Sequence, residues 1–249
     1  MNIQITALSE SNPSVNMLVY GDSGAGKTVL GGTAPRALIL AVEAGTISAA
    51  RQGSKAHVVD CSTYPKFAAV LNAARAGTLR HPDGEKFSWL VVDSLTMFQE
   101  KLQTDVIEKA HASNPNRSAT ILDMMGHQEF QRLYKRVVNA LNDLDENVLY
   151  LCHAMRKTDE ELDPIILPHL TGKFGTDDST ACARWTVGTM DIYGYLAVSK
   201  KAKAEGEPER RRLIVERRDA YFGKDRLNLF GGHIDQPNMA EIHSAIFGA

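Results

Sequence analysis

The sequence has little of what marks secreted, zinc-binding or membrane-spanning proteins. Its 249 residues include three cysteines, Cys61, Cys152 and Cys182, which lie far apart and form no C-x-x-C pair. This spacing favours neither a disulfide framework nor a zinc site. No apolar run reaches the roughly 20 residues that a membrane-spanning helix requires. The first residues also lack the basic and apolar segments of a signal peptide. We therefore expect a cytoplasmic protein with no membrane partner.

The sequence also lacks a large excess of charge of either sign. The formal net charge is -2 at pH 7, and 43% of the residues are hydrophobic, which is an ordinary globular composition. Nothing in this balance draws the whole molecule toward nucleic acid, so any such binding must come from local basic clusters. The length is enough for one large domain or two small ones.

Short apolar runs alternate along the chain with segments of helical periodicity. Predicted strands lie at 15–21, 37–45, 56–61, 89–93 and 147–155, and predicted helices at 66–77, 95–111, 127–144 and 240–247. The alternation predicts an α/β fold with a mostly parallel central sheet flanked by helices. Two later apolar segments, 190–201 and 210–219, predict an antiparallel extension at the C-terminal end. We expect residues 1–14 to form an arm and residues 15–249 a single domain.

The strongest motif is "GDSGAGKT", which begins at Gly21 and matches the phosphate-loop pattern G-x-x-x-x-G-K-[ST]. A predicted strand precedes it, and a helix is expected to begin at Lys27. The glycines let successive backbone N–H groups face a phosphate chain, and the lysine reaches the β- and γ-phosphates. The hydroxyl of Thr28 suits Mg²⁺, so the motif predicts ATP and Mg²⁺ as cofactors. The predicted nucleotide-binding residues are Gly21, Asp22, Ser23, Gly24, Ala25, Gly26, Lys27, Thr28 and Val29.

A second motif is "WLVVDSLTMF", in which a buried strand ends on Asp93. This carboxylate is placed to hold the Mg²⁺ ion together with Thr28, and the alternative is that it only caps the following helix. Ser94 follows, where many ATPases carry a glutamate that activates water. The alternative base is Glu43, at the end of "ALILAVEAG". The carboxyl ends of parallel strands face the ligand, so Glu43 is the predicted base if its strand adjoins the others. A plain surface role for this glutamate stays open.

These motifs resemble a known family. "LILAVEAG", "LVVDSLT" and "VLYLCHAMRK" are similar to the corresponding segments of RecA-like recombinases. The resemblance implies that Glu43 is the catalytic base and that His153 senses the γ-phosphate, where the family usually has glutamine. Alternatively, His153 is a strand-end histidine satisfied by the backbone. The size, the phosphate loop and the late segment "ERRDAYFGKDR" look most like the phage RecA-like ATPases of the Sak superfamily, which are implicated in single-strand annealing. The resemblance covers residues 16–229 and implies a RecA-like P-loop core.

The resemblance also implies two loops that hold single-stranded DNA, here residues 112–126 and 156–180. The predicted DNA contacts are Arg117, Arg156, Lys157, Lys173, Phe174, Arg217 and Arg226. Cations neutralise backbone phosphates, and an aromatic ring stacks a base. The second loop also carries acidic residues that would repel DNA. The alternative is a lid over the active site without a DNA role.

A basic cluster, "RRRLIVERRDAYFGKDR", occupies residues 210–226. In RecA-like assemblies, basic residues after a late strand reach the γ-phosphate of the neighbouring subunit. The resemblance implies this catalytic role for Arg218 and Lys224. Direct binding of DNA phosphates is the alternative, and the sequence does not separate the two. Residues 210–212 have the pattern of a solvated strand end.

Two functions follow from these motifs. The first is an ATP-dependent, single-stranded DNA-binding recombination protein that promotes annealing or strand exchange, with its ATPase stimulated by DNA. It would form a homo-oligomer, either a ring or a filament, with nucleotide at the subunit interface. Its partner in the host cytoplasm would be a phage single-strand-binding protein. The second is a P-loop nucleotide switch that acts through protein partners without DNA binding. A small-molecule kinase is disfavoured because no lid domain is evident. An AAA+ machine is disfavoured because it would have a glutamate at position 94 and a helical lid.

Overall fold

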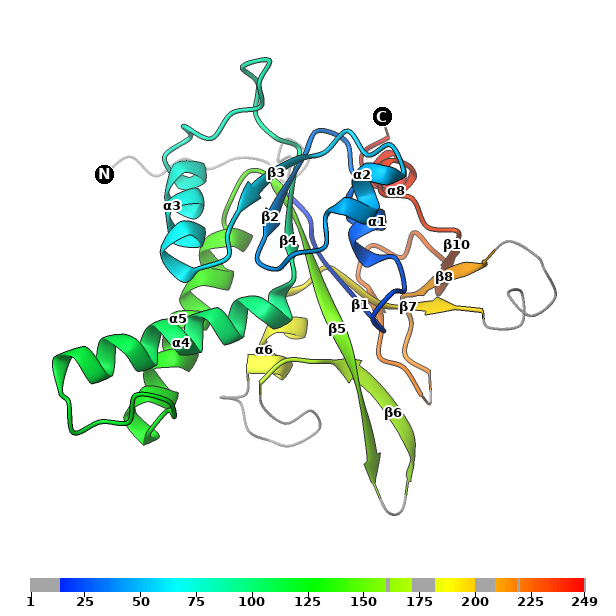
Figure 1. Cartoon of the computed structure of the whole chain (residues 1–249). Helices are drawn as coiled ribbons and strands as arrows, with labels where there is room; N and C mark the ends of the chain where they lie inside the picture. The colour runs from blue at the N-terminus through cyan, green and yellow to red at the C-terminus, as the bar shows by residue number, and fades with distance from the viewer. Residues whose placement is uncertain (1–13, 160–161, 172–181, 200–208, 219, 249) are drawn as a thin grey trace, which may run out of the picture.

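The computed structural model describes residues 14–159, 162–171, 182–199, 209–218 and 220–248 (Figure 1). The strands are β1 (Asn16–Gly21), β2 (Ala37–Ala41), β3 (His57–Asp60), β4 (Trp89–Asp93), β5 (Asn147–Asp159), β6 (Leu162–Pro168), β7 (Ile192–Val198), β8 (Arg211–Ile214), β9 (Lys224–Asp225) and β10 (His233–Asp235). The helices are α1 (Lys27–Gly31), α2 (Ile47–Arg51), α3 (Tyr64–Arg75), α4 (Leu95–Ser113), α5 (Met124–Asn142), α6 (Cys182–Thr189) and α8 (Met239–Phe247).

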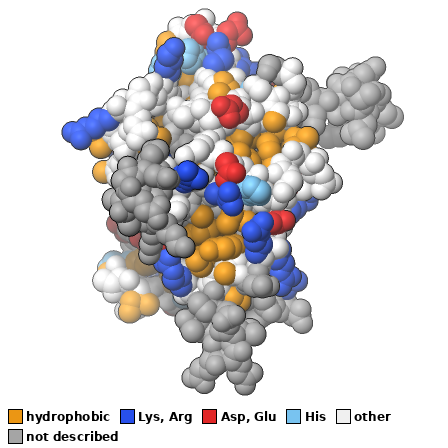
Figure 2. Space-filling model, turned by 90° about the vertical axis from the view of Figure 1, so that its right-hand side faces the viewer, with side chains coloured by type: hydrophobic (Ala, Val, Ile, Leu, Met, Phe, Trp, Pro, Cys, Tyr) orange, Lys and Arg blue, Asp and Glu red, His pale blue; other side chains and the backbone are white. Residues whose placement is uncertain are grey.

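The described strands form one sheet in the order β10-β8-β7-β1-β5-β4-β2-β3, with β6 paired to β5 and β9 paired to β7. The pairs from β7 to β3 along this path are parallel. The pairs that involve β6, β8, β9 and β10 are antiparallel. This arrangement confirms the predicted α/β class with an antiparallel C-terminal extension. The β7, β8 and β10 side faces the viewer in Figure 2, where cationic side chains lie around an area of apolar ones.

Alternate residues of the central strands feed two separate cores, because successive side chains of a strand point to opposite faces. Leu18 and Tyr20 of β1 belong to the larger cluster, which packs against α3, α4, α5 and α6. Met17 and Val19 belong to the smaller cluster, which packs against α1 and α8. Figure 1 shows the helices on both sides of the sheet. Burial on both faces explains why these strands read as continuous apolar runs.

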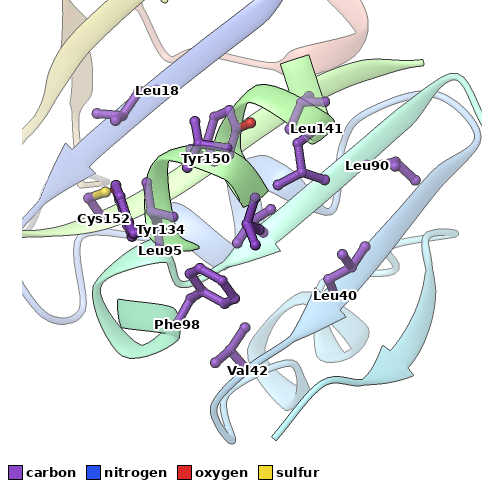
Figure 3. Packing of buried hydrophobic residues seen from close by; sticks show 14 of the residues in the cluster. Leu18, Leu40, Val42, Leu90, Leu95, Phe98, Tyr134, Leu141, Tyr150 and Cys152 are labelled. Atoms are coloured by element: carbon purple, nitrogen blue, oxygen red, sulfur yellow. The ribbon is translucent and has the colours of Figure 1, made fainter. Parts of the chain in front are cut away.

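Aromatic side chains fill much of the larger cluster (Figure 3). Phe98 of α4 and Phe67 of α3 have ring centroids 4.4 Å apart. The buried hydroxyls have partners, since Tyr150 donates to Asn142 Oδ1 at 2.7 Å and the Tyr134 oxygen lies 3.0 Å from Thr186 Oγ1. Each large apolar side chain that is fully buried contributes about 1.5–3 kcal/mol to folding. The layer thus ties α4 and α5 firmly to the sheet.

The segment after β5 differs from its sequence prediction. The sequence predicts an irregular stretch from residue 156, whereas β5 continues to Asp159 and pairs with β6 to form a hairpin. Pro164 and Pro168 lie within β6, which pairs with β5 on one side and makes an isolated bridge from Ile166 to Tyr221 on the other. A strand near the edge of a sheet tolerates proline. The prolines therefore explain why the sequence pattern did not predict this strand. Residues 172–181 of the predicted loop, and residues 1–13 of the predicted arm, lie outside the described residues.

The segment between the two long helices also differs from its prediction. The sequence predicts a DNA-facing loop at 112–126, but α4 extends to Ser113 and α5 begins at Met124, where Asp123 Oδ1 accepts the N–H of Gly126 at 2.7 Å. The connection lies at the far end of a two-helix arm (Figure 1). Helices α2 and α6 and strands β9 and β10 were not predicted. Among the described residues, no helix has the length and apolar character needed to cross a membrane.

Candidate active site

A cleft of about 340 Å³ lies at the carboxyl ends of β1, β2, β4 and β5. The strand register places these ends at one level, because Gly21 pairs with His153 and Ala41 pairs with Asp93. The cleft is lined by the predicted nucleotide-binding residues Ser23, Gly24, Gly26, Lys27, Thr28 and Val29, and also by Glu43, Asp93 and His153. The carboxyl end of a parallel sheet is the usual place for a ligand in this class of fold.

The phosphate loop has the backbone that its glycines permit. Gly24 and Gly26 have φ angles of 78° and 94°, in the left-handed region that favours glycine. Helix α1 begins at Lys27, so its free N–H groups and positive end face the cleft. Lys27 Nζ donates to the carbonyl oxygens of Gly21 and Asp22, each at 3.0 Å. Burial lowers the pKa of Lys27, and the nearby carboxylate of Asp93 opposes that shift.

The predicted metal ligands lie in direct contact. Thr28 Oγ1 donates to Asp93 Oδ2 at 2.7 Å, and Asp93 is only 6% exposed. Burial raises the pKa of Asp93, while the hydrogen bond from Thr28 acts against the rise. Hydroxyl and carboxylate oxygens are donors that suit Mg²⁺, which usually keeps several waters and takes the rest of its shell from phosphates. Among the described residues, no group of three or more acidic, histidine or cysteine side chains is arranged to hold a metal ion.

Ser94, and not Asp93, caps α4. Its Oγ accepts the N–H of Met97 at 3.3 Å, so the alternative role of Asp93 as the helix cap is not what the structure shows. The same Oγ donates to Glu43 Oε1 at 2.6 Å. Strands β2 and β4 are direct neighbours, which is the condition that the sequence argument placed on Glu43. The serine at this position therefore holds the predicted base. The Asp93–Ser94 peptide bond is cis.

His153 also contacts the predicted base. Its Nε2 lies 3.2 Å from Glu43 Oε1, and its backbone N–H donates to Thr96 Oγ1 at 3.0 Å. Its ring is therefore directed at the glutamate, and the alternative of a ring satisfied by the backbone does not describe this contact. From Ala154 onward, β5 leaves the central sheet and pairs with β6. The His169 N–H donates to the carbonyl of His153 at 2.8 Å, which ties the hairpin base to the site.

An ion pair links the hairpin to the phosphate loop. Arg156 Nη2 lies 2.6 Å from Asp22 Oδ2, and the Tyr195 hydroxyl donates to the same oxygen at 3.4 Å. The Arg156 hydrogen bond lowers the pKa of the Asp22 carboxyl. Arg156 was predicted to contact DNA, and in this structure its guanidinium lies on the nucleotide-binding loop. Lys157, the next predicted DNA contact, is exposed on the same hairpin.

The structure adds one arginine that the sequence did not single out. Arg211, at the start of β8, lines the cleft, and its Nε donates to the carbonyl of Ala25 at 3.0 Å. Its Nη2 donates to Glu209 Oε2 at 2.6 Å. The sequence pattern predicted only a solvated strand end here, because three consecutive arginines look alike. Only the register of β8 on β7 shows which of them faces the phosphate loop.

Arg218 and Lys224 do not line the cleft of their own subunit. Arg218 forms an ion pair with Glu216. Lys224 Nζ donates to the carbonyl of Met190 at 2.6 Å, next to the amino end of β7. Strand β7 runs parallel to β1, so Lys224 lies at the edge of the sheet opposite the phosphate loop. A role for these residues on the nucleotide of a neighbouring subunit stays a prediction.

The remaining predicted DNA contacts are dispersed. Arg117 forms a two-pronged ion pair with Asp123 at 2.7 and 2.8 Å, beyond the end of α4. That helix has 19 residues and is about 28 Å long, so Arg117 is far from the cleft. Arg217 lies over the Phe222 ring at 5.0 Å, and Arg226 pairs with Asp191 at 3.2 Å. The predicted contacts Lys173 and Phe174 lie outside the described residues.

Comparison with known proteins identifies a family for this chain. The sequence model of a family described as an AAA domain matches residues 14–227. No curated protein matches the chain. Among solved structures, the KaiC-like protein PH0186 from Pyrococcus horikoshii OT3 is similar with a TM-score of 0.43 and 10% identity. The similarity covers 82% of this chain and 78% of that one.

The family match limits one sequence argument. The sequence disfavours an AAA+ machine on two grounds, the serine at position 94 and a strand-rich C-terminal part, and both features are present in the structure. They separate this chain from AAA members with a glutamate after the metal-binding aspartate, and not from AAA domains as a whole. The narrower resemblance to the phage Sak superfamily stays a prediction. With the match spanning most of its length, the chain belongs to the AAA domain family and is a P-loop ATPase.

Proposed function

We propose that this ATPase uses Glu43 as its general base and couples ATP hydrolysis to the binding of single-stranded DNA. One observation carries the proposal. Strand β5 runs without interruption from His153, which contacts Glu43, to Arg156 and Lys157 on the hairpin. A change at the γ-phosphate would therefore reach two exposed cations through a single strand.

The hydrolysis step follows from the contacts of Glu43. Ser94 and His153 both lie within hydrogen-bond distance of its Oε1, and no described residue forms a hydrogen bond with Oε2. That second oxygen is left to accept a proton from water beside the γ-phosphate. Lys27 compensates charge on the β- and γ-phosphates. Thr28 and Asp93 would hold Mg²⁺, which when bound neutralises charge on the phosphate oxygens.

Coupling would depend on the hydrogen bond between His153 and Glu43. A γ-phosphate next to His153 competes for the same ring nitrogen, so nucleotide binding changes the contact that holds the start of the hairpin. The ion pair between Arg156 and Asp22 joins the hairpin to the phosphate loop at a second point. Cations on the hairpin and on the face seen in Figure 2 offer contacts to backbone phosphates. DNA affinity is then expected to follow the nucleotide state.

The DNA role is tested by ATP turnover with and without single-stranded DNA, and by DNA binding at two salt concentrations. We expect turnover to rise with DNA and binding to weaken with salt. The Lys157→Ala variant should weaken binding, whereas Lys55→Ala, which removes an exposed cation just before β3, should not. If the wild type shows no stimulation by DNA and no salt-dependent binding, this function is excluded.

The base is tested by Glu43→Gln. This variant should bind ATP as tightly as the wild type and lose turnover by about 10²–10⁴-fold, because the amide cannot accept the proton from water. Binding is measured by calorimetry and turnover by phosphate release. Normal hydrolysis by Glu43→Gln would show that another group is the base.

The proposed assembly is a homo-oligomer with nucleotide at the subunit boundary, where Arg218 or Lys224 reaches the neighbouring γ-phosphate. Mixing Lys27→Ala subunits with Arg218→Ala subunits should restore part of the activity, because hybrid interfaces then combine an intact loop with an intact arginine. No recovery, with both variants still oligomeric, would count against a role in trans.

A second candidate function is a nucleotide switch that acts through a protein partner. It is favoured by the tip of the two-helix arm, where Ile121, Met124 and Met125 are 70%, 77% and 70% exposed. Exposed apolar side chains that lie together often mark a contact surface. The two functions separate in one experiment. Under the first function, DNA stimulates ATP turnover in the wild type, and a variant with Met124→Ser and Met125→Ser keeps the full stimulation. Under the second function, DNA does not stimulate turnover even in the wild type.

A further inference from the structure

We propose that Arg211 closes the nucleoside end of the cleft, with its guanidinium plane against the base of the nucleotide bound by the same subunit. The inference rests on the proposed binding of ATP by the phosphate loop. It adds a residue that determines nucleotide affinity to a site otherwise built from β1, β2, β4 and β5.

The position of β8 in the sheet decides which end of the nucleotide Arg211 can reach. Glu43, Asp93 and His153 come from β2, β4 and β5, which lie on one side of β1. Arg211 comes from β8, on the opposite side of β1 beyond β7. The first group marks the γ-phosphate, because it holds the predicted base and metal ligand. An arginine that approaches the loop from the other flank lies toward the nucleoside.

The backbone of Arg211 is held in place at the sheet edge. Its N–H donates to Gln236 Oε1 at 3.2 Å, and its carbonyl accepts the N–H of Gln236 at 2.8 Å. The side chain is bound at Nε by Ala25 and at Nη2 by Glu209. Among the described residues, nothing bonds to Nη1. The side chain is 29% exposed and lines the cleft. A planar guanidinium of this kind stacks well on an aromatic ring.

Gly26 allows this close approach. A Cβ atom at Gly26 would lie 2.9 Å from Arg211 Nε, so any other residue would push the guanidinium away from the loop. The neighbouring Arg212 on β8 pairs instead with Asp235 at the protein surface and is not in the cleft. Two adjacent arginines on one strand thus offer a test residue and its matched control.

The experiment compares Arg211→Ala, Arg211→Lys and the control Arg212→Ala. Calorimetry measures the affinity of each for Mg²⁺–ATP, Mg²⁺–ADP and inorganic tripolyphosphate, which has phosphates and no base. Arg211→Ala should weaken ATP and ADP equally, by about tenfold, and leave tripolyphosphate unchanged. Arg211→Lys keeps the charge without the plane and should fall between wild type and Arg211→Ala. Arg212→Ala should bind all three like wild type.

Kinetics and mixing complete the test. The KM for ATP should rise in Arg211→Ala with a far smaller change in kcat, as expected for contacts made equally in the ground and transition states. Mixing Arg211→Ala with Lys27→Ala subunits should restore nothing, because the arginine serves its own phosphate loop. Thermal unfolding without nucleotide checks that the variants fold.

Several outcomes would overturn the inference. An equal loss for tripolyphosphate would show a phosphate contact, and a fall in kcat alone would show a transition-state role. Recovery on mixing would show a role in trans, and unchanged affinities would show no role. Failure of the wild type to bind any of the three ligands would overturn the proposed ATPase function and this inference together. Failure of the Arg211 comparison alone would leave the proposed function intact.

Discussion

At the scale of single residues, one hydroxyl in this site performs two tasks. Ser94 Oγ donates to Glu43 and accepts from the N–H of Met97, so it orients the predicted base and caps α4 at the same time. Ser94 is fully buried. A glutamate at this position would leave Glu43 without this partner. In the proposed mechanism, the serine after Asp93 therefore orients a base that follows β2.

Ser94→Ala should therefore lower turnover while ATP binding is retained, because Glu43 loses a partner that holds its orientation. Loss of the cap should also destabilise the protein by about 0.5–2 kcal/mol. The control is Asn238→Ala, since Asn238 caps α8 with a 2.8 Å bond to the N–H of Ala240. It should lose similar stability with unchanged turnover. Equal turnover in the two variants would contradict a positioning role for Ser94.

A site residue could be predicted from the sequence when the pattern that identifies it lies close to it along the chain. Lys27 and Thr28 lie in a local motif that the sequence shows directly, and Asp93 ends an apolar run. Glu43 required one assumption about neighbouring strands, which the pairing of β2 with β4 satisfies. Arg211 was not predictable, because it meets Ala25 across 186 residues of sequence and nothing local distinguishes it from the arginines beside it.

At the scale of elements, β5 passes through two environments. From Asn147 to Leu151 it has a neighbour on each side, β1 and β4, whereas from Ala154 on it pairs with β6. The apolar sequence located the first part. The second part is polar and lies at an edge, so it carries no strand pattern. The ion pair between Arg156 and Asp22 holds this outer part to the phosphate loop.

That ion pair should show in a double-mutant cycle. Asp22→Asn and Arg156→Ala should have non-additive effects on folding stability at neutral pH, and the coupling should be small because both side chains are exposed to solvent. Because the folded-state pKa of Asp22 is lowered, its contribution is present above the unfolded value of 3.8 and is lost as the pH falls through the folded pKa. Denaturant unfolding at neutral and strongly acidic pH measures both. Coupling that persists in acid, or is absent at neutral pH, would contradict the assignment. Lys157→Ala with Asp22→Asn is the control pair.

At the scale of the whole molecule, one sheet separates two cores, and all three cysteines are buried in the larger one. The alternation of apolar runs and periodic segments was enough to predict this layered arrangement. The C-terminal strands were only partly predictable, since β9 and β10 have two and three residues and make no pattern. The two long helices were predicted to within three residues at each end, because their helical period is strong over most of their length.

The cysteines should report on the integrity of the larger core. Burial raises the pKa of Cys61 and Cys152 to about 12 and that of Cys182 to about 11. Thiolate is the reactive form, so the native protein should react very slowly with a thiol reagent at neutral pH. All three thiols should react in denaturant. Ser118→Cys, at an exposed position, should label at once and serves as the positive control. Fast labelling of a native cysteine would contradict the described packing.

The junction within β5 has a consequence for amide hydrogen exchange. Amides between β1 and β4 exchange only when the whole domain opens, whereas those of a two-stranded hairpin exchange through local opening. The boundary between slow and fast exchange should therefore fall near His153, the residue that contacts Glu43. Added nucleotide should move this boundary outward along the hairpin. Without nucleotide, His153 should mark the border between slowly and rapidly exchanging amides.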